Sequence, residues 1–241
     1  MAAARVRSAQ KSLDTRALLV RRVDYGESDL VLTLFTERRG LLSALARSAR
    51  RSQKRFGGAL EPMHTLRVRL DERPSSELFV LAEAKIEIPR MRLLSTLDRL
   101  EAAGRALGWV RRASPPRTPE PEVWSALDAL LERLDAARVE PRMELASAGL
   151  ALLVAFGWGI DLERCVSCGK PCPPDRPALI DVARGGLVCR ECGGARLRVP
   201  GPARARLSRA AAGHGGALEP GDLDLALDLV ERAFRAHLGF D

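Results

Sequence analysis

Four of the five cysteines form two matched pairs, Cys165-Val-Ser-Cys168-Gly169 and Cys189-Arg-Glu-Cys192-Gly193. Two C-x2-C turns at this separation are typical of a tetrahedral zinc site, because each turn offers two thiolates to one ion. The glycine after each pair suits a tight turn with positive φ. The sequence therefore predicts one structural zinc ion, held by Cys165, Cys168, Cys189 and Cys192.

The environment of the cysteines favours metal binding over disulfide formation. Residues 1–15 are basic and polar and lack the apolar stretch of a signal peptide, so we expect a cytosolic protein with reduced thiols. The apolar stretch from Leu145 to Ile160 is too short and too interrupted by glycine to span a bilayer. The fifth cysteine, Cys172, is either a spare loop thiol or an alternative ligand of the same ion.

The positive charge is concentrated in the N-terminal quarter. Residues 1–60 contain 13 Lys and Arg against 5 Asp and Glu, whereas residues 61–241 contain 26 of each. Seven cations fall in residues 38–55 with no acid among them: Arg38, Arg39, Arg47, Arg50, Arg51, Lys54 and Arg55. Guanidinium groups pair bidentately with phosphate and release its counterions, so this distribution favours nucleic-acid binding. The alternatives are a role in solubility or the docking of an acidic protein partner.

Five short segments rich in β-formers precede residue 89. They are Ala17–Val23, Leu30–Thr36, Leu41–Ala46, Thr65–Leu70 and Glu77–Ile88. Five strands separated by turn signals within about 75 residues suit a small closed barrel. The turn from Glu37 to Gly40 is interpreted as a hairpin whose tip carries two arginines.

Helical periodicity follows Pro89. Apolar stripes predict helices over residues 93–112, 122–138, 141–157, 202–212 and 222–238. Pro141 suits the first turn of a nearly all-apolar helix, which we expect at the centre of this half. Residues 114–121 contain four prolines, which forbid a helix, and they are interpreted as a linker.

No catalytic constellation is visible. The sequence lacks a phosphate-binding P-loop motif, the three histidines are scattered, and four thiolates leave a zinc ion no open position to activate water. Aromatic residues are few in the predicted barrel, which favours contact with the phosphate backbone over base reading. Phe56, in the basic loop, is the candidate for base contact, with a role as loop anchor as the alternative.

The chain resembles the bacterial RecO family of DNA repair mediators. The resemblance is carried by Leu19–Ser28, by Leu34–Leu41, by the basic run Ala46–Arg51, by the two cysteine pairs and by the ending Ala236–Phe240. The family's basic run usually has a glycine where Ser48 stands here.

The resemblance implies an α+β protein with an N-terminal five-stranded OB-fold barrel and a helical domain that holds the zinc. We expect a disordered basic tail at 1–15, the OB-fold at 16–88, and the helical domain at 89–241 with its zinc segment at about 161–196. The implied function is to bind single- and double-stranded DNA, anneal complementary strands and help load recombinase onto DNA coated by single-strand-binding protein. The implied partners are RecR and the acidic C-terminal tail of that binding protein.

We therefore expect a non-catalytic, cytoplasmic, nucleoid-associated DNA-binding protein. The DNA-binding residues we predict are Arg21, Arg22, Arg38, Arg39, Arg47, Arg50, Arg51, Lys54 and Arg55. The alternatives are a zinc-containing nucleic-acid enzyme, such as a glycosylase or nuclease, and an adaptor that docks an acidic peptide. Arg184, Arg190, Arg196 and Arg198 give the zinc segment the means for a secondary DNA contact.

Overall fold

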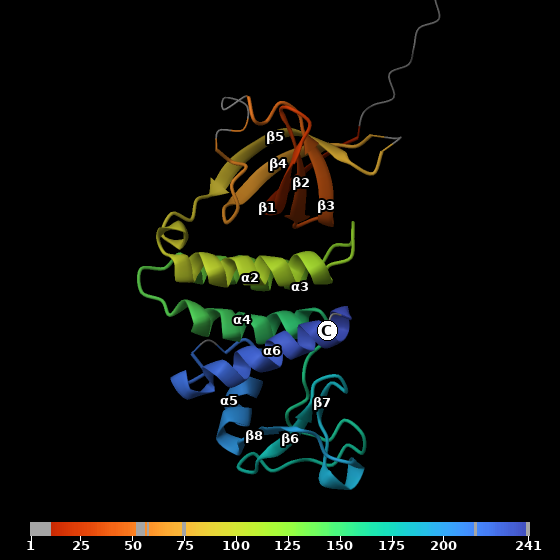
Figure 1. Cartoon of the computed structure of the whole chain (residues 1–241), viewed down its shortest axis with the longest axis vertical. Helices are drawn as coiled ribbons and strands as arrows, with labels where there is room; N and C mark the ends of the chain where they lie inside the picture. Colours follow the sequence, from red (N-terminus) through yellow and green to blue (C-terminus); the bar gives the residue numbers. More distant parts are fainter. Residues whose placement is uncertain (1–10, 52–55, 57, 74–75, 215, 240–241) are drawn as a thin grey trace, which may run out of the picture. The chain divides into compact units, whose positions relative to one another are not determined.

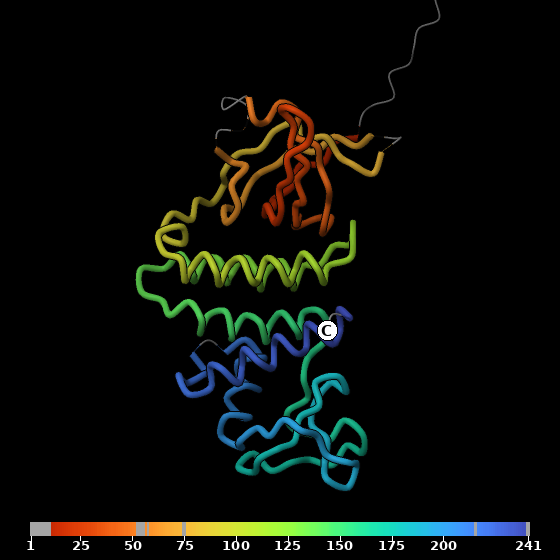
Figure 2. Tube along the Cα trace, viewed as in Figure 1, coloured from red at the N-terminus to blue at the C-terminus, as the bar shows by residue number. Residues whose placement is uncertain are grey.

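A computed structural model describes residues 11–51, 56, 58–73, 76–214 and 216–239. The chain divides into two compact units. The first contains residues 1–91 together with 114–124, and the second contains residues 92–113 and 125–241. Figure 1 labels the elements of both units, and Figure 2 traces the path of the chain. In the part that the structure describes, no helix combines the length and apolar character needed to cross a membrane.

The first unit is a closed five-stranded barrel, as the sequence predicted. Its strands are β1 (Ser12–Tyr25), β2 (Asp29–Thr36), β3 (Gly40–Ala46), β4 (Thr65–Asp71) and β5 (Phe79–Ile88). Their spatial order is β1-β2-β3-β5-β4, and β4 pairs with β1 to close the sheet. The β3–β5 pair is parallel and the others are antiparallel. This arrangement is the five-stranded barrel architecture of an OB-fold.

Strand β1 joins two sides of the barrel because it is long enough to have two partners. Its first half pairs with β4 and its second half with β2, and the register shifts between Leu19 and Arg21. The expected disordered tail is wrong for residues 12–15, which belong to this strand. Thr15 is fully buried there. Residues 1–10 lie outside the described residues.

The residues expected to form a linker instead belong to the first unit. Arg117 donates its backbone N–H to the carbonyl oxygen of Leu41 at 2.9 Å, and Pro116 forms a parallel bridge with the same residue. Trp124, 4% exposed, packs against Phe35 with ring centroids 5.9 Å apart. The first unit is therefore discontinuous in sequence, and its boundary is not a single point near residue 88.

The second unit is built on five helices and a small sheet. The helices are α2 (Leu97–Ala113), α3 (Pro121–Leu134), α4 (Pro141–Ala155), α5 (Gly201–Ala211) and α6 (Leu223–Leu238). The first turn of α3 falls in the first unit. Short 3-10 turns cover Leu93–Ser95, Arg190–Cys192 and Pro220–Asp222.

Helix α4 forms the centre of the second unit, as its composition predicted. Pro141 occupies its first turn, and the side chain of Glu140 caps it by accepting the N–H of Met143 at 2.7 Å. It packs against α2, α5 and α6. A Cβ added at Gly149 would lie 2.7 Å from Val230 of α6, so a glycine lets these two helices approach closely.

The part of the chain around the four cysteines carries a sheet that the sequence did not predict. Strand β6 (Ala178–Asp181) pairs with β7 (Gly186–Leu187) on one side and with β8 (Leu197–Val199) on the other, all antiparallel. The strands are two to four residues long, too short for periodicity to reveal them.

Candidate metal centre and nucleic-acid interface

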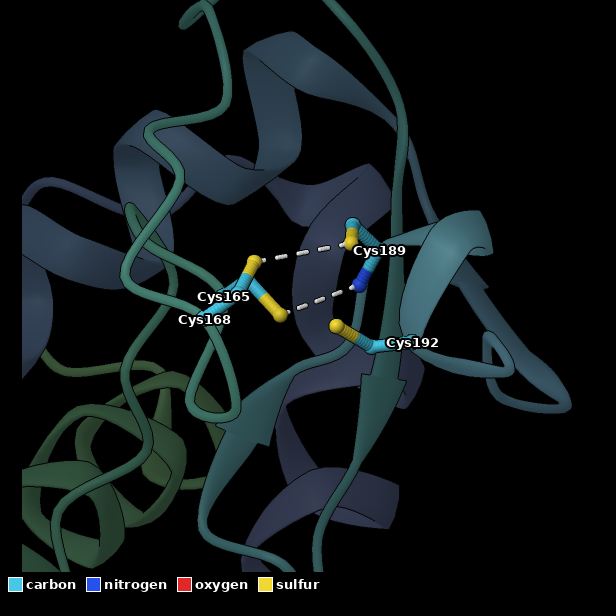
Figure 3. A group of neighbouring side chains, drawn as sticks. All are labelled: Cys165, Cys168, Cys189 and Cys192. Carbon is cyan, nitrogen blue, oxygen red and sulfur yellow. Dashed lines mark hydrogen bonds between the residues drawn. The ribbon is translucent and has the colours of Figure 1, made fainter.

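The four paired cysteines converge on one point. The sulfur atoms of Cys165, Cys168, Cys189 and Cys192 all lie within 4.8 Å of one another, and Figure 3 shows the two pairs facing each other. The sulfur atoms of Cys168 and Cys189 are 3.8 Å apart. A tetrahedral Zn–S bond of about 2.3 Å places neighbouring sulfurs about 3.8 Å apart, so the spacing fits a closed four-thiolate zinc site.

Each C-x2-C turn is closed by the glycine that follows it. Gly169 has φ 72° and donates its N–H to the carbonyl of Cys165 at 2.8 Å. Gly193 has φ 99° and donates to the carbonyl of Arg190 at 3.1 Å. The predicted positive φ is confirmed at both positions, and both turns use the conformational freedom that glycine has.

The thiols of the group differ in their tendency to ionise. The backbone N–H of Cys189 donates to the sulfur of Cys165 at 3.4 Å and is the main cause that lowers the pKa of Cys165 to about 6. Hydrogen bonds with Cys189 and Cys168 raise the pKa of Cys192 to about 12. Four thiolates this close repel one another, so a cation is needed before all four can ionise.

Cys172 lies outside this group. Its N–H donates to the carbonyl of Glu163 at 2.8 Å, and its own carbonyl accepts from Arg204. Those contacts fix the backbone of Cys172 against other parts of the second unit. The arrangement favours the interpretation of Cys172 as a spare thiol.

Two basic runs are linked through the β1–β2 turn: Arg21 and Arg22 lie in β1, before the turn, and residues 47–51 are bonded to the turn itself. The backbone N–H of Arg50 donates to the carbonyl of Ser28 at 3.0 Å, and that of Ser48 donates to Asp29 Oδ1 at 2.7 Å. These bonds hold residues 47–51 against the β1–β2 turn. The two runs together form what we call the turn cluster: Arg21, Arg22, Arg47, Arg50 and Arg51.

Three arginines of the turn cluster form ion pairs with acids of the same unit. Arg22 contacts Glu61 at 2.6 Å. Arg50 contacts Asp24 at 3.5 Å and Arg51 contacts Glu27 at 3.2 Å. All six side chains are at least 47% exposed, so water and salt screen these pairs.

The other two arginines of the turn cluster have no partner among the residues that the structure describes. Arg21 and Arg47 are exposed, and the structure shows no hydrogen bond or ion pair for either guanidinium within the described residues. Because neither guanidinium has to give up an ion pair with a carboxylate, these two arginines of the turn cluster are the most readily available to bind a phosphate.

The remaining predicted cations are not brought to the same place. Arg38 and Arg39 lie in the β2–β3 turn, at the other end of β2 from the turn cluster. An eight-residue strand at about 3.3 Å per residue is over 20 Å long. Arg38 donates to the carbonyl of Asp14 at 3.3 Å, and Arg39 pairs with Glu72 at 3.7 Å. Lys54 and Arg55 lie outside the described residues.

Of the two roles considered for Phe56, its burial favours that of a loop anchor over that of a base contact. Phe56 is only 4% exposed and belongs to the barrel core, as does Phe79, whereas Phe35 is buried against Trp124. Tyr25, which the sequence did not single out, is 60% exposed at the end of β1. Its position three and four residues after two arginines, and just before a Gly-containing turn, was the available signal.

Comparison with known proteins agrees with this architecture. The family model for the N-terminal part of recombination protein O matches residues 11–89, and the model for its C-terminal part matches residues 94–241. The chain belongs to the RecO family. The recognition made from the sequence is thereby confirmed, together with the OB-like barrel followed by a helical domain.

Several curated relatives support the membership. A protein named DNA repair protein RecO from Anaeromyxobacter sp. (strain Fw109-5) is 35% identical over 237 residues, which cover 94% of this chain and 91% of the relative. Its namesake from Geobacter metallireducens is 34% identical and covers 95% and 93% of the two chains. That from Myxococcus xanthus is 38% identical over 75% of this chain and 72% of its own length.

Proposed function

We propose that this RecO family protein acts in recombinational DNA repair as a non-catalytic mediator that binds DNA through the turn cluster. It anneals complementary single strands and helps load recombinase onto DNA coated by single-strand-binding protein. The observation that carries the DNA-binding part is that residues 47–51, which include three arginines, are bonded to the turn that ends β1, the strand of Arg21 and Arg22. The annealing and loading steps rest on the resemblance to the family.

The charges of the turn cluster suit a phosphate backbone better than a neutral ligand. Exposed ion pairs such as Arg51 with Glu27 contribute at most about 1 kcal/mol, so a phosphate displaces the carboxylate at little cost. Guanidinium groups grip phosphate bidentately and release its counterions, which favours binding whatever the base sequence. In this proposal the cluster contributes affinity through the phosphate backbone, which carries no sequence information.

The four-cysteine site has a structural role in this proposal. Cys165, Cys168, Cys189 and Cys192 would hold one Zn²⁺, which supplies folding free energy and no catalytic position. The ion would fix the turns around residues 165–169 and 189–193 to the sheet of β6, β7 and β8. The proposed protein partners are RecR and the acidic C-terminal tail of single-strand-binding protein.

The DNA-binding site is tested by a combined Arg21→Ala, Arg47→Ala, Arg50→Ala and Arg51→Ala variant. Affinity for single strands and duplexes of several sequences should fall together, and the slope of log affinity against log salt should become shallower by about 0.7–0.9 per lost phosphate contact. Arg232→Ala, on α6, is the matched control because Arg232 is an exposed arginine paired with Asp228 at 2.7 Å. Unchanged affinity and slope in the quadruple variant would reject the turn cluster as the site.

The mediator role needs a functional assay. Annealing of complementary strands coated by single-strand-binding protein should be faster with the wild-type protein than with the quadruple variant. Incubation with labelled duplex, with and without magnesium, should leave the strands intact. Cleavage or base release would instead favour the alternative of a nucleic-acid enzyme. An acidic peptide that competes with DNA for the turn cluster would favour the adaptor alternative.

A further inference from the structure

One aromatic ring of the barrel is not used to hold the barrel together. The structure describes all four aromatic residues of β1 to β5 and their loops. Three are in the core, at 0%, 4% and 6% exposure, whereas Tyr25 is 60% exposed. Tyr25 makes no ring contact or hydrogen bond through its side chain within the described residues. We propose that Tyr25 stacks on an unpaired base, which makes the turn cluster a site for single-stranded DNA.

The local fold does not need the Tyr25 ring. The β1–β2 turn is held by Gly26 at φ 58°, and by the bonds from Arg50 to the Ser28 carbonyl and from Ser48 to the Asp29 carboxylate. None of these bonds involves the Tyr25 side chain. An exposed aromatic ring without a structural partner is thus free to bind a ligand.

The strand places Tyr25 on an apolar outer face. Alternation along β1 puts Arg21, Val23 and Tyr25 on the same side of the sheet. Val23 is 43% exposed and lies opposite Val31 of β2, which in turn lies opposite Leu45 of β3. Val31 and Leu45 are both half-buried. Val23, Val31 and Leu45 therefore form an apolar strip across three strands, and the Tyr25 ring follows Val23 on the same face of β1.

Cations flank Tyr25 along the chain. Arg51 pairs with Glu27, two residues after Tyr25, whereas Arg50 pairs with Asp24, which alternation places on the opposite face of β1 from the ring. Arg21, which has no partner within the described part of the chain, lies on the same face of β1 as the ring. An exposed aromatic ring on the face of Arg21, next to the turn whose Glu27 holds Arg51, matches a chain that offers an unstacked base next to a phosphate. Those two features occur together in single-stranded nucleic acid and not in an intact duplex, where the bases already stack on each other.

The ring adds a selectivity that the arginines cannot supply. Arginine–phosphate pairs form with single strands and duplexes alike, whereas stacking on an aromatic side chain requires a free base. Since every base has a π face, the contact should tolerate any sequence. The inference rests on the proposed function, because it takes the turn cluster as the DNA-binding site.

The test compares Tyr25→Ala and Tyr25→Phe in the full-length protein. Binding is measured with a labelled oligothymidine and with a duplex of the same length. Tyr25→Ala should weaken oligothymidine binding by about 5- to 150-fold, the range found for loss of one stacked base, and leave duplex binding unchanged. Tyr25→Phe should keep wild-type affinity for both, because it retains the ring. The thermal midpoints should match that of the wild type, since the ring has no structural partner.

A second measurement reports the contact directly. An oligonucleotide that carries 5-iodouracil should, on irradiation, form an adduct on the peptide that contains Tyr25, the only tyrosine of the chain. Adducts confined to other peptides would contradict stacking on this ring.

The outcomes separate this inference from the proposed function. If the wild type binds neither DNA, the proposed function fails. If the wild type binds both and Tyr25→Ala has no effect, or weakens both equally, the stacking role is overturned while DNA binding stands. A loss in Tyr25→Phe equal to that in Tyr25→Ala would assign the effect to the hydroxyl group and would also overturn it.

Discussion

The backbone of Gly40 lies directly against the carbonyl oxygen of Thr118, so that a Cβ added to Gly40 would stand 1.8 Å from that oxygen. Gly40 closes the β2–β3 turn, and Thr118 belongs to the proline-rich residues after α2. The contact is continued by Arg117, whose guanidinium lies over the Phe79 ring at 5.4 Å and donates to the Glu77 carbonyl at 2.7 Å. The proline-rich segment is thus part of the barrel's surface.

Gly40→Ala should therefore destabilise the first unit strongly. A side chain at φ 61° costs about 1–2 kcal/mol by itself, and the overlap with Thr118 adds to this because backbone must move. Chemical denaturation of the purified variant measures the loss in free energy of unfolding.

Gly26→Ala is the matched control for Gly40→Ala. Gly26 has nearly the same φ, 58°, but nothing within 4 Å of its would-be Cβ. The loss in free energy of unfolding for Gly26→Ala should therefore be limited to the cost of placing a side chain at positive φ. Equal losses in the two variants would show that the approach of Thr118 to Gly40 does not contribute to stability.

Local patterns predicted most of the fold. The five strands, the five helices and the cysteine group follow from apolar periodicity, turn residues and ligand spacing, which are set by neighbours in sequence. The contact of residues 114–124 with the barrel could not be predicted, because a run of prolines excludes a helix but does not indicate what the segment contacts. The division of the arginines between two ends of β2 likewise depends on strand pairing.

The sequence also did not predict which aromatic rings of the first unit are buried. Phe56 and Tyr25 both lie among arginines in the chain, yet one ring enters the core and the other stays exposed. Phe56 precedes Ala59 and Leu60, both buried, whereas Tyr25 ends a strand at a hairpin turn. The difference lies in tertiary packing, which the neighbouring residues in the sequence do not encode.

Cys189→Ser should remove most of the zinc from the protein. The wild type should carry about one zinc per chain by elemental analysis, and the variant should become sensitive to proteolysis within residues 161–199, because a closed site supplies folding free energy. Helices α2 and α4, which have no ligand, should remain protected.

Cys172→Ser is the control for the zinc prediction. Because Cys172 lies outside the four-cysteine group, its variant should keep the metal content and protease resistance of the wild type. Loss of zinc in Cys172→Ser would make Cys172 a ligand, and zinc-free wild-type protein of full stability would refute the site.

Ser48→Gly should stabilise the protein by about 0.5–1 kcal/mol. Ser48 has φ 54°, in the left-handed region that glycine adopts without strain. Its bond to Asp29 uses the backbone N–H, which glycine keeps. The same change at Ser43, an exposed position within β3, should instead destabilise by a similar amount, because glycine weakens a strand. Denaturant unfolding of both variants checks the predicted difference in sign.

The acid sensitivity of the second unit should depend on Asp222. This buried carboxylate accepts Arg206 Nε at 2.5 Å and its terminal nitrogen at 2.8 Å, and it also accepts the N–H of Glu219 at 2.9 Å. The hydrogen bonds from Arg206 are the main cause that lowers the pKa of Asp222. A lowered pKa in the folded state means that the carboxylate stabilises the fold above the unfolded pKa of about 4, and that this contribution is lost as the pH falls through the folded pKa.

Asp222→Asn should accordingly lower the thermal midpoint by several degrees near neutral pH, and the difference from the wild type should shrink as the pH falls below about 4. Asp224→Asn is the matched control. Asp224 pairs with Arg142 at 3.0 Å, but its side chain is 92% exposed, so its variant should follow the wild type at every pH. Thermal unfolding followed by circular dichroism across this pH range measures both. A difference between Asp222→Asn and the wild type that stays constant to low pH would show that the charge of Asp222 does not stabilise the fold, and that its loss acts through packing alone.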